Sequence, residues 1–147
     1  MAGLAGKAVA VVGTGSALHR AIAMALAEAG VDIAVGTQAS TKEQEFAVAS
    51  IANEVWAIGR EQFSHVMDAA SIDAVAGLIA ETRRKLGRCD ALVVIEEGPP
   101  VDTLEVTGVP TVYVGGLGEN AIVLSAANEE TAARVVERVS GLAGAEA

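Results

Sequence analysis

Hydrophobic residues follow two alternating patterns along the chain. Short apolar runs rich in valine are typical of strands buried in a parallel sheet, and they occur at residues 7–12, 32–36, 62–67 and 90–95. Apolar residues at helical spacing occur between these runs, at residues 18–29, 41–58 and 71–86. This regular alternation predicts an open parallel sheet wrapped by helices.

Two of these helices show apolar faces that we predict to be buried. Thr41 is placed to cap the second helix. The predicted buried face of that helix comprises Phe46, Ala49, Ala52, Val55 and Trp56. The corresponding face of the third helix comprises Ile72, Val75, Ala76, Ile79 and Leu86.

The last third of the chain has a different pattern. Residues 96–110 contain all three prolines and no clear helix, and residues 111–115 and 121–126 read as two more strands. The short connection between these strands favours an antiparallel hairpin. Asn128 caps a final helix with an apolar face, which the sequence leaves free to pack on its own sheet or on another subunit. That face comprises Ala132, Val135, Val136, Val139 and Leu142.

These elements predict an α/β fold of the Rossmann-like, doubly wound type. We expect a mostly parallel sheet of about six strands with helices on both faces. The predicted strand order is 3-2-1-4, and the two late strands follow strand 4. Residues 1–147 are predicted to form a single domain.

Composition and charge limit the classes of partner. The chain is 52% hydrophobic and carries a net charge of −9, which argues against nucleic acid and anionic membranes as main partners. The single Cys89 excludes a disulfide framework within one chain, and neither His19 nor His65 has a partner at metal-ligand spacing. No membrane span is predicted, and we expect a cytoplasmic protein.

A glycine-rich turn follows the first predicted strand and opens the first helix. It reads Gly13-Thr14-Gly15-Ser16-Ala17-Leu18. In doubly wound folds, backbone N–H groups and the positive end of the helix dipole bind phosphate at this place. The turn is therefore either a phosphate site or a tight connection that binds nothing.

Residues 4–98, which include this turn, resemble the N-terminal half of the short-chain dehydrogenases/reductases. Arg20-Ala21-Ile22-Ala23 and Met67-Asp68 are the clearest short matches. The resemblance divides the domain into a dehydrogenase-like core at residues 1–98 and a divergent strand-strand-helix extension at 99–147. The candidate cofactor-binding residues that it implies are Gly13, Gly15, Ser16, Leu18, Thr37 and Asp68.

The turn departs from the pattern of that family. Val12 replaces its threonine, Ala17 its second glycine and His19 its third glycine. We expect His19 either to plug the turn or to lie on the helix surface. Where the family has Asn-Asn-Ala-Gly after the fourth strand, this chain has Ile95-Glu96-Glu97-Gly98, which places two carboxylates near the expected cofactor position. Paired carboxylates could also serve acid/base chemistry.

The catalytic Tyr-x-x-x-Lys of the family is missing. Tyr113 is the only tyrosine, and Leu117 stands where the lysine would be. The sequence also stops where the substrate-binding half would begin. After the second strand, Thr37, Ser40 and Lys42 could hold a phosphate and no acid is present, so any cofactor is expected to be NADP rather than NAD.

Two functions remain open at this stage. The first is a non-catalytic relative of the dehydrogenases that binds no cofactor and acts by association. It would form a homodimer or tetramer, or serve a full-length dehydrogenase-like subunit, through the third helix and the final helix. The second is an oxidoreductase-type protein that binds NADP(H) or another nucleotide with its altered turn.

Overall fold

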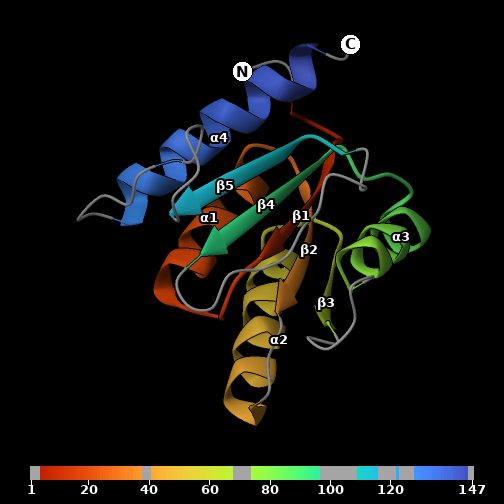
Figure 1. Cartoon of the computed structure of the whole chain (residues 1–147), viewed down its shortest axis with the longest axis vertical. Coiled ribbons are helices and arrows are strands. Elements are labelled where there is room, and N and C mark those ends of the chain that lie inside the picture. The colour runs from red at the N-terminus through yellow and green to blue at the C-terminus, as the bar shows by residue number, and fades with distance from the viewer. Residues whose placement is uncertain are drawn as a thin grey trace.

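The fold is described from a computed structural model, at residues 4–37, 41–67, 74–96, 109–115, 122 and 128–145. Strands and helices alternate up to β4, and one more strand and one more helix follow (Figure 1). The strands are β1 Ala8–Val12, β2 Asp32–Thr37, β3 Gln62–Val66, β4 Ala91–Glu96 and β5 Thr111–Gly115. The helices are α1 Ala17–Glu28, α2 Lys42–Ala57, α3 Ala74–Leu86 and α4 Asn128–Ala145.

The five strands form one parallel sheet in the order β3-β2-β1-β4-β5. The predicted fold class and the predicted order 3-2-1-4 are therefore confirmed. β1 lies in the middle of the sheet, where Val11 is in register with Val35 of β2 and with Val93 of β4. All five residues of β1 are buried, as expected for a strand covered on both faces.

The side chains of β1 alternate between two hydrophobic cores. Val9 and Val11 face a core shared with α1, α2 and α4, whereas Ala10 and Val12 face a core shared with α3. Figure 1 shows α3 set apart from the other three helices. Helices therefore cover both faces of the sheet, as predicted.

The final helix packs on its own chain. α4 contacts α1, β4 and β5, and it buries Ala132, Val135 and Val139 completely or nearly so. Val136 is half-buried against the same core, and the side chain of Leu142 lies outside the described residues. This packing answers the question that the sequence left open: the described part of the apolar face of α4 lies against its own chain.

The predicted buried face of α2 is wrong at three of its five positions. Phe46 is 78% exposed and Trp56 68% exposed, and Ala49 is also exposed. The residues that pack against the sheet are Val48, Ile51, Ala52 and Val55. α2 carries two apolar stripes at helical spacing, and the branched side chains of one stripe fill the core.

In α3 the buried face is shifted from the prediction. Val75 and Ile79 are buried as expected, Leu86 is half-buried, and Ile72 lies outside the described residues. Ala76 is exposed, and Leu78 takes its place in the core. The reason is geometric: Leu78 reaches the sheet beside Gly36, where a glycine leaves room for it.

The predicted antiparallel hairpin at the end of the sheet is also wrong. Ile122 forms a parallel bridge with Val114 of β5. Its N–H donates to the Tyr113 carbonyl at 2.8 Å, and its carbonyl accepts from the Gly115 N–H at 2.8 Å. Because one residue bonds to both neighbours of Val114, the pairing has the parallel pattern. Ile122 is the only described residue of the predicted strand at 121–126.

None of the helices in the described segments is long and apolar enough to cross a membrane.

Candidate functional site: the turn between β1 and α1

The glycine turn lies at the carboxyl end of the central strand β1 and at the first turn of α1. Ser16 caps the helix, and its Oγ accepts the N–H of His19 at 3.2 Å. The N–H of Gly13 donates to the Gly36 carbonyl of β2 at 3.0 Å. The turn is thus placed where doubly wound folds bind their ligands, at the carboxyl ends of adjacent strands.

His19 fills the inside of this turn. Its side chain is fully buried, and its Nδ1 accepts the N–H of Gly15 at 3.0 Å. The ring Nε2 lies 3.0 Å from the Val11 carbonyl. Because Nδ1 accepts a hydrogen bond, Nε2 carries the hydrogen and donates it to Val11. Of the two positions predicted for His19, the structure has the one that plugs the turn, and the surface position is wrong.

Burial keeps the His19 ring neutral. Desolvation lowers its pKa from 6.5 to about 4, against the raising effect of the bond to Val11. Both ring nitrogens are engaged, one as acceptor and one as donor. At neutral pH the ring therefore links β1 to the turn through two hydrogen bonds and has no proton available for acid/base chemistry.

Both glycines of the turn are explained by packing. A Cβ on Gly13 would lie 2.8 Å from Nδ1 of His19. Gly15 has a φ of +79°, and a Cβ there would lie 2.6 Å from the Cβ of Ala47 on α2. The turn therefore needs glycine at both positions even with no ligand bound.

The structure brings most of the predicted cofactor-binding residues together. Gly13, Gly15, Ser16 and Leu18 share the turn, but the side chain of Leu18 packs in the core, which leaves only its backbone for a ligand. Thr37 ends β2 next to Gly36, and its side chain is buried. Asp68 lies outside the described residues, and so do Ser40, Glu97 and Gly98.

The first N–H groups of α1 are the remaining phosphate donors of the turn. An α-helix cannot bond its first N–H groups internally, and Ser16 takes that of His19. The N–H groups of Ala17 and Leu18 precede it at the positive end of the helix dipole. An anion could bind these two groups without moving His19.

Tyr113 and the lysine nearest to it in sequence both have structural contacts, and the described residues assemble no metal site. Tyr113 lies in β5 in register with Val94 and packs against the core on the α3 face. Lys85, the lysine nearest in sequence, lies over the Phe63 ring, 4.9 Å from its centroid. Within the described ranges no three His, Cys, Asp or Glu side chains could hold a metal ion.

Cys89 has the character of a structural thiol. It is partly buried against the core on the α3 face, and its Sγ lies 3.6 Å from the Ala91 carbonyl. Desolvation raises its pKa to about 11, so the thiol is protonated at neutral pH. Cys89 thus serves as a small, partly buried residue of this core.

The residue that sequence reasoning missed at this site is Ala47. Its methyl group closes the space beside Gly15 and brings α2 against the turn. Nothing in the local sequence of α2 indicates this contact, because it depends on how α2 is placed relative to α1.

Three solved structures similar to this chain are dehydrogenases. The first is an NAD+-bound xylitol dehydrogenase, 31% identical, with 61% of this chain and 33% of that chain aligned at a TM-score of 0.53. The second is a hydroxysteroid dehydrogenase from Escherichia coli, 26% identical, with 65% and 38% aligned at 0.55. The third is a short chain dehydrogenase from Mycobacterium avium, 29% identical, with 63% and 34% aligned at 0.55.

No family model and no curated protein sequence matches the chain. The aligned part spans about a third of the length of each of these dehydrogenases. The likeness extends to both backbone and sequence, with identities above a quarter. The chain thus resembles the N-terminal part of the short-chain dehydrogenases/reductases and has their Rossmann-like parallel sheet.

Proposed function

We propose that this protein is a non-catalytic relative of the short-chain dehydrogenases that acts by association in the cytoplasm. Its partner would be a second copy of itself or a full-length dehydrogenase-like subunit. The observation that carries the proposal is the buried His19 ring, which takes the Gly15 N–H for its own Nδ1.

The chemistry of dinucleotide binding explains why this matters. A glycine turn holds pyrophosphate with backbone N–H groups and with the space left by missing side chains. Here the Gly15 N–H donates to Nδ1 of His19, and the imidazole ring fills the turn. The sequence also lacks Tyr-x-x-x-Lys, since Leu117 follows Tyr113 at the lysine position. Binding and hydride transfer thus lose their usual groups together.

A second function is favoured by a different observation. The N–H groups of Ala17 and Leu18 keep the position of an anion site at the start of α1. Lys42 opens α2 beyond Thr37 and could neutralise a phosphate. One of the similar dehydrogenases was solved with NAD+ bound. Under this alternative the protein binds NADP(H) or another nucleotide through a turn of altered shape.

Titration with NADP, NAD and adenosine diphosphate distinguishes the two functions. Thermal unfolding of the wild type should not shift with any of them, whereas a ligand at 100 times its dissociation constant would add about 2.7 kcal/mol of stability. The double variant Ala17→Gly with His19→Gly should gain dinucleotide binding, because it restores the space and frees the Gly15 N–H.

The matched control is Ala76→Gly with Ala80→Gly, which places two glycines at exposed positions of another helix. It reproduces the loss of helix propensity, about 1 kcal/mol per glycine, without touching the turn. Wild-type protein that binds NADP as tightly as the turn variant would refute the plug and establish the second function.

A further inference from the structure

β3 is an open edge of the sheet. It pairs with β2 on one side and ends the strand order β3-β2-β1-β4-β5. Figure 1 shows it at the border of the sheet, between α2 and α3. Its bonds to β2 include those from the Ile33 N–H to the Glu61 carbonyl, at 3.1 Å, and from the Met67 N–H to the Thr37 carbonyl, at 2.7 Å.

The backbone groups of every second residue of β3 point away from β2. In this parallel pair, three residues of β2 are each in register with one residue of β3 and bond to the two neighbours of that residue. The residues of β3 left out of these bonds are Gln62, Ser64 and Val66. Their N–H and C=O groups have no hydrogen-bond partner among the described residues. Such a row of donors and acceptors is a template for a further strand.

The free edge of β3 lacks the lysine, proline or bulge with which natural proteins keep a second strand away. The strand reads Gln-Phe-Ser-His-Val, and its register with β2 is unbroken. Ser64 is exposed, and Val66 is 40% exposed. An extended chain can therefore approach the edge without displacing a side chain that guards it.

The side of α2 that faces this edge carries an exposed indole. Ala47 packs against the glycine turn and Glu54 binds Arg20, so both point toward α1. α1 covers β1 and β2, whereas α2 covers β2 and β3, which puts the opposite side of α2 toward the open edge. Ala49 and Trp56 follow Ala47 and Glu54 by about half a helical turn and lie on that side. Trp56 is 68% exposed there.

On the α3 face, the same edge is lined by an aromatic cluster. Nζ of Lys85 lies over the buried Phe63 ring, 4.9 Å from its centroid. The ring of His65 meets that of Phe63 edge to face, with the centroids 6.5 Å apart. Because side chains alternate along a strand, a strand added to β3 would contact Trp56 with one set of side chains and this cluster with the other.

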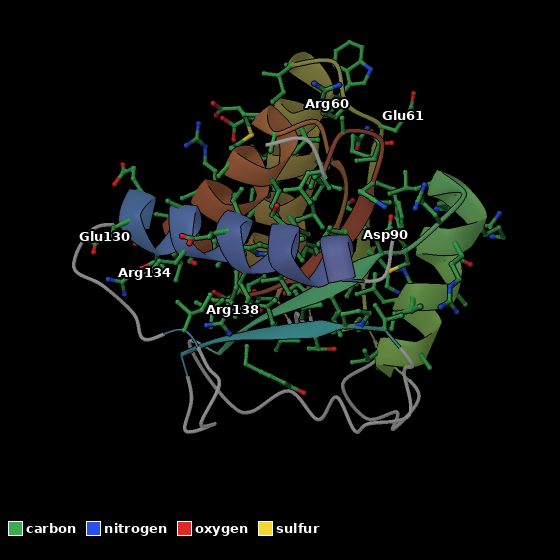
Figure 2. All side chains as sticks on the ribbon, turned by 90° about the horizontal axis from the view of Figure 1, so that it is seen from above. Arg60, Glu61, Asp90, Glu130, Arg134 and Arg138 are labelled. Atoms are coloured by element: carbon green, nitrogen blue, oxygen red, sulfur yellow. The ribbon has the colours of Figure 1, made fainter. Side chains whose placement is uncertain are left out.

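The charges around the edge favour a basic segment. Glu61 is exposed just before β3, and Glu45 is exposed one helical turn before Ala49. Lys42 offsets one of these charges, while Arg60 is drawn toward α1, where its Nε donates to a backbone carbonyl at 2.9 Å. Figure 2 shows Arg60 and Glu61 where the chain leaves α2. Because the whole chain carries a net charge of −9, it repels a second copy or an acidic segment and attracts a basic one.

We propose that the free edge of β3 binds an extended segment of a partner protein, apolar at alternate positions and basic at its ends, which adds to the sheet as a further strand. Its main chain bonds to Gln62, Ser64 and Val66, and its apolar side chains cover Trp56. The inference rests on the association part of the proposed function and names the surface and the chemistry of the partner's segment. It differs from the expectation of the sequence, which placed association on the third and the final helix.

The probe for the first test is the synthetic peptide Lys-Lys-Val-Thr-Val-Thr-Val-Lys-Lys, blocked at both ends and added to the full chain. Trp56 is the only tryptophan, so its emission should shift to the blue as the peptide binds. The same core flanked by glutamate in place of lysine should bind about fivefold more weakly or less, because the ion pairs are replaced by repulsion.

Two N-methylated forms of this peptide test the main-chain bonds. One is methylated at its valines and the other at its threonines. Only every second residue of an added strand turns its N–H toward β3. One form should therefore bind like the parent peptide, and the other should lose about tenfold or more. Equal binding of the two forms would show that side chains alone hold the peptide, and it would overturn the inference.

A variant of the edge gives the matching result from the side of the protein. Ser64→Pro removes the central outward N–H, and an edge strand tolerates proline where the N–H faces solvent. It should weaken binding of the lysine peptide about fivefold or more. The matched control Ser64→Ala keeps that N–H and should bind like the wild type. If Ser64→Pro does not fold, the two N-methylated peptides on the wild type decide the same point.

The remaining outcomes separate this inference from the proposed function. Failure of the lysine peptide to bind overturns the inference and leaves the non-catalytic function standing. A doubling of mass in sedimentation that Ser64→Pro abolishes would put a second copy at the edge, which overturns the basic partner segment but retains association. A nucleotide that raises the melting temperature of the wild type overturns the non-catalytic function, whatever the peptide does.

Discussion

The turn before α1 and the outer face of α2 treat their most conspicuous side chains in opposite ways. His19 is polar and completely buried, whereas Phe46 and Trp56 are apolar and exposed. The two helices contact one another, and Ala47 of α2 touches Gly15 of the turn. A buried polar group is tolerated when its hydrogen bonds are satisfied, and both nitrogens of His19 are. Within the part of the chain that the structure describes, Phe46 and Trp56 have no comparable cover and remain exposed.

The largest expected effect concerns the fit between Gly13 and His19. Gly13→Ala should destabilise the wild type by about 1–3 kcal/mol, because its methyl group overlaps the His19 ring. His19→Ala should cost about 3 kcal/mol, since it leaves the Gly15 N–H and the Val11 carbonyl without their partner. Urea unfolding of the two single variants and the double variant measures their coupling.

In the double variant the methyl group introduced at position 13 would enter the space vacated by the ring. Adding Gly13→Ala to His19→Ala should therefore cost close to nothing. Additive losses in the double-mutant cycle would mean that the ring does not occupy the turn as described. The contrast between the buried His19 and the exposed Phe46 and Trp56 would then not hold.

The next effect is the dependence of stability on pH. The pKa of His19 is lowered from 6.5 to about 4, so the unfolded chain binds more protons than the folded one between these values. Stability from this group is complete above the unfolded value and is lost as the pH falls toward 4. Between about pH 7 and about pH 5 the loss should be about 2 kcal/mol.

The control for this prediction is His19→Gln, which can donate and accept a hydrogen bond but does not titrate. Partial burial also lowers the pKa of His65, which contributes with the same sign in both proteins. The difference between the two proteins therefore isolates His19. Equal pH profiles for the wild type and the glutamine variant would show that His19 is accessible to water in solution.

The smallest effect belongs to the ion pair that joins α1 to α2. Arg20 binds Glu54 through two guanidinium nitrogens, with a closest N–O distance of 2.7 Å, and both side chains are well exposed. Its contribution should be below about 1 kcal/mol, because water and salt screen exposed pairs. Arg20→Ala should shift the urea midpoint only slightly. A larger loss would indicate that α1 and α2 depend on each other more than their apolar contacts suggest.

Much of the fold could be predicted because its signals are local and redundant. The valine-rich runs, the helical periodicity between them and their alternation lead to the strand order 3-2-1-4, which the sheet follows. Ser16 and Thr41 cap helix starts in the structure, and the sequence pattern identifies Thr41 as a cap. A strand buried on both faces of a parallel sheet is restricted to apolar residues, so the valine-rich run is enough to predict β1 as a buried strand.

Where the sequence offered two equivalent choices, the prediction failed. α2 has one stripe at Val48, Ile51, Ala52 and Val55 and another at Phe46, Ala49 and Trp56, and periodicity alone does not rank them. In the structure α2 packs on β2 and β3 with the first stripe, and the aromatic side chains of the second stripe lie outward. The hairpin prediction failed similarly, since a short connection does not determine the direction in which Ile122 pairs.

Local pattern was therefore sufficient for the class of fold, the central strands and the place of the glycine turn. Those properties follow from residue type and spacing, which act over a few neighbours in the chain. The orientation of His19, the contact of Ala47 with Gly15 and the exposure of Phe46 and Trp56 were settled by packing between elements. A side chain at a helix start can turn inward or outward at similar local cost. The space under the turn and the nearness of α2 select one of these states, because close-packed interiors admit only the arrangement that fills them.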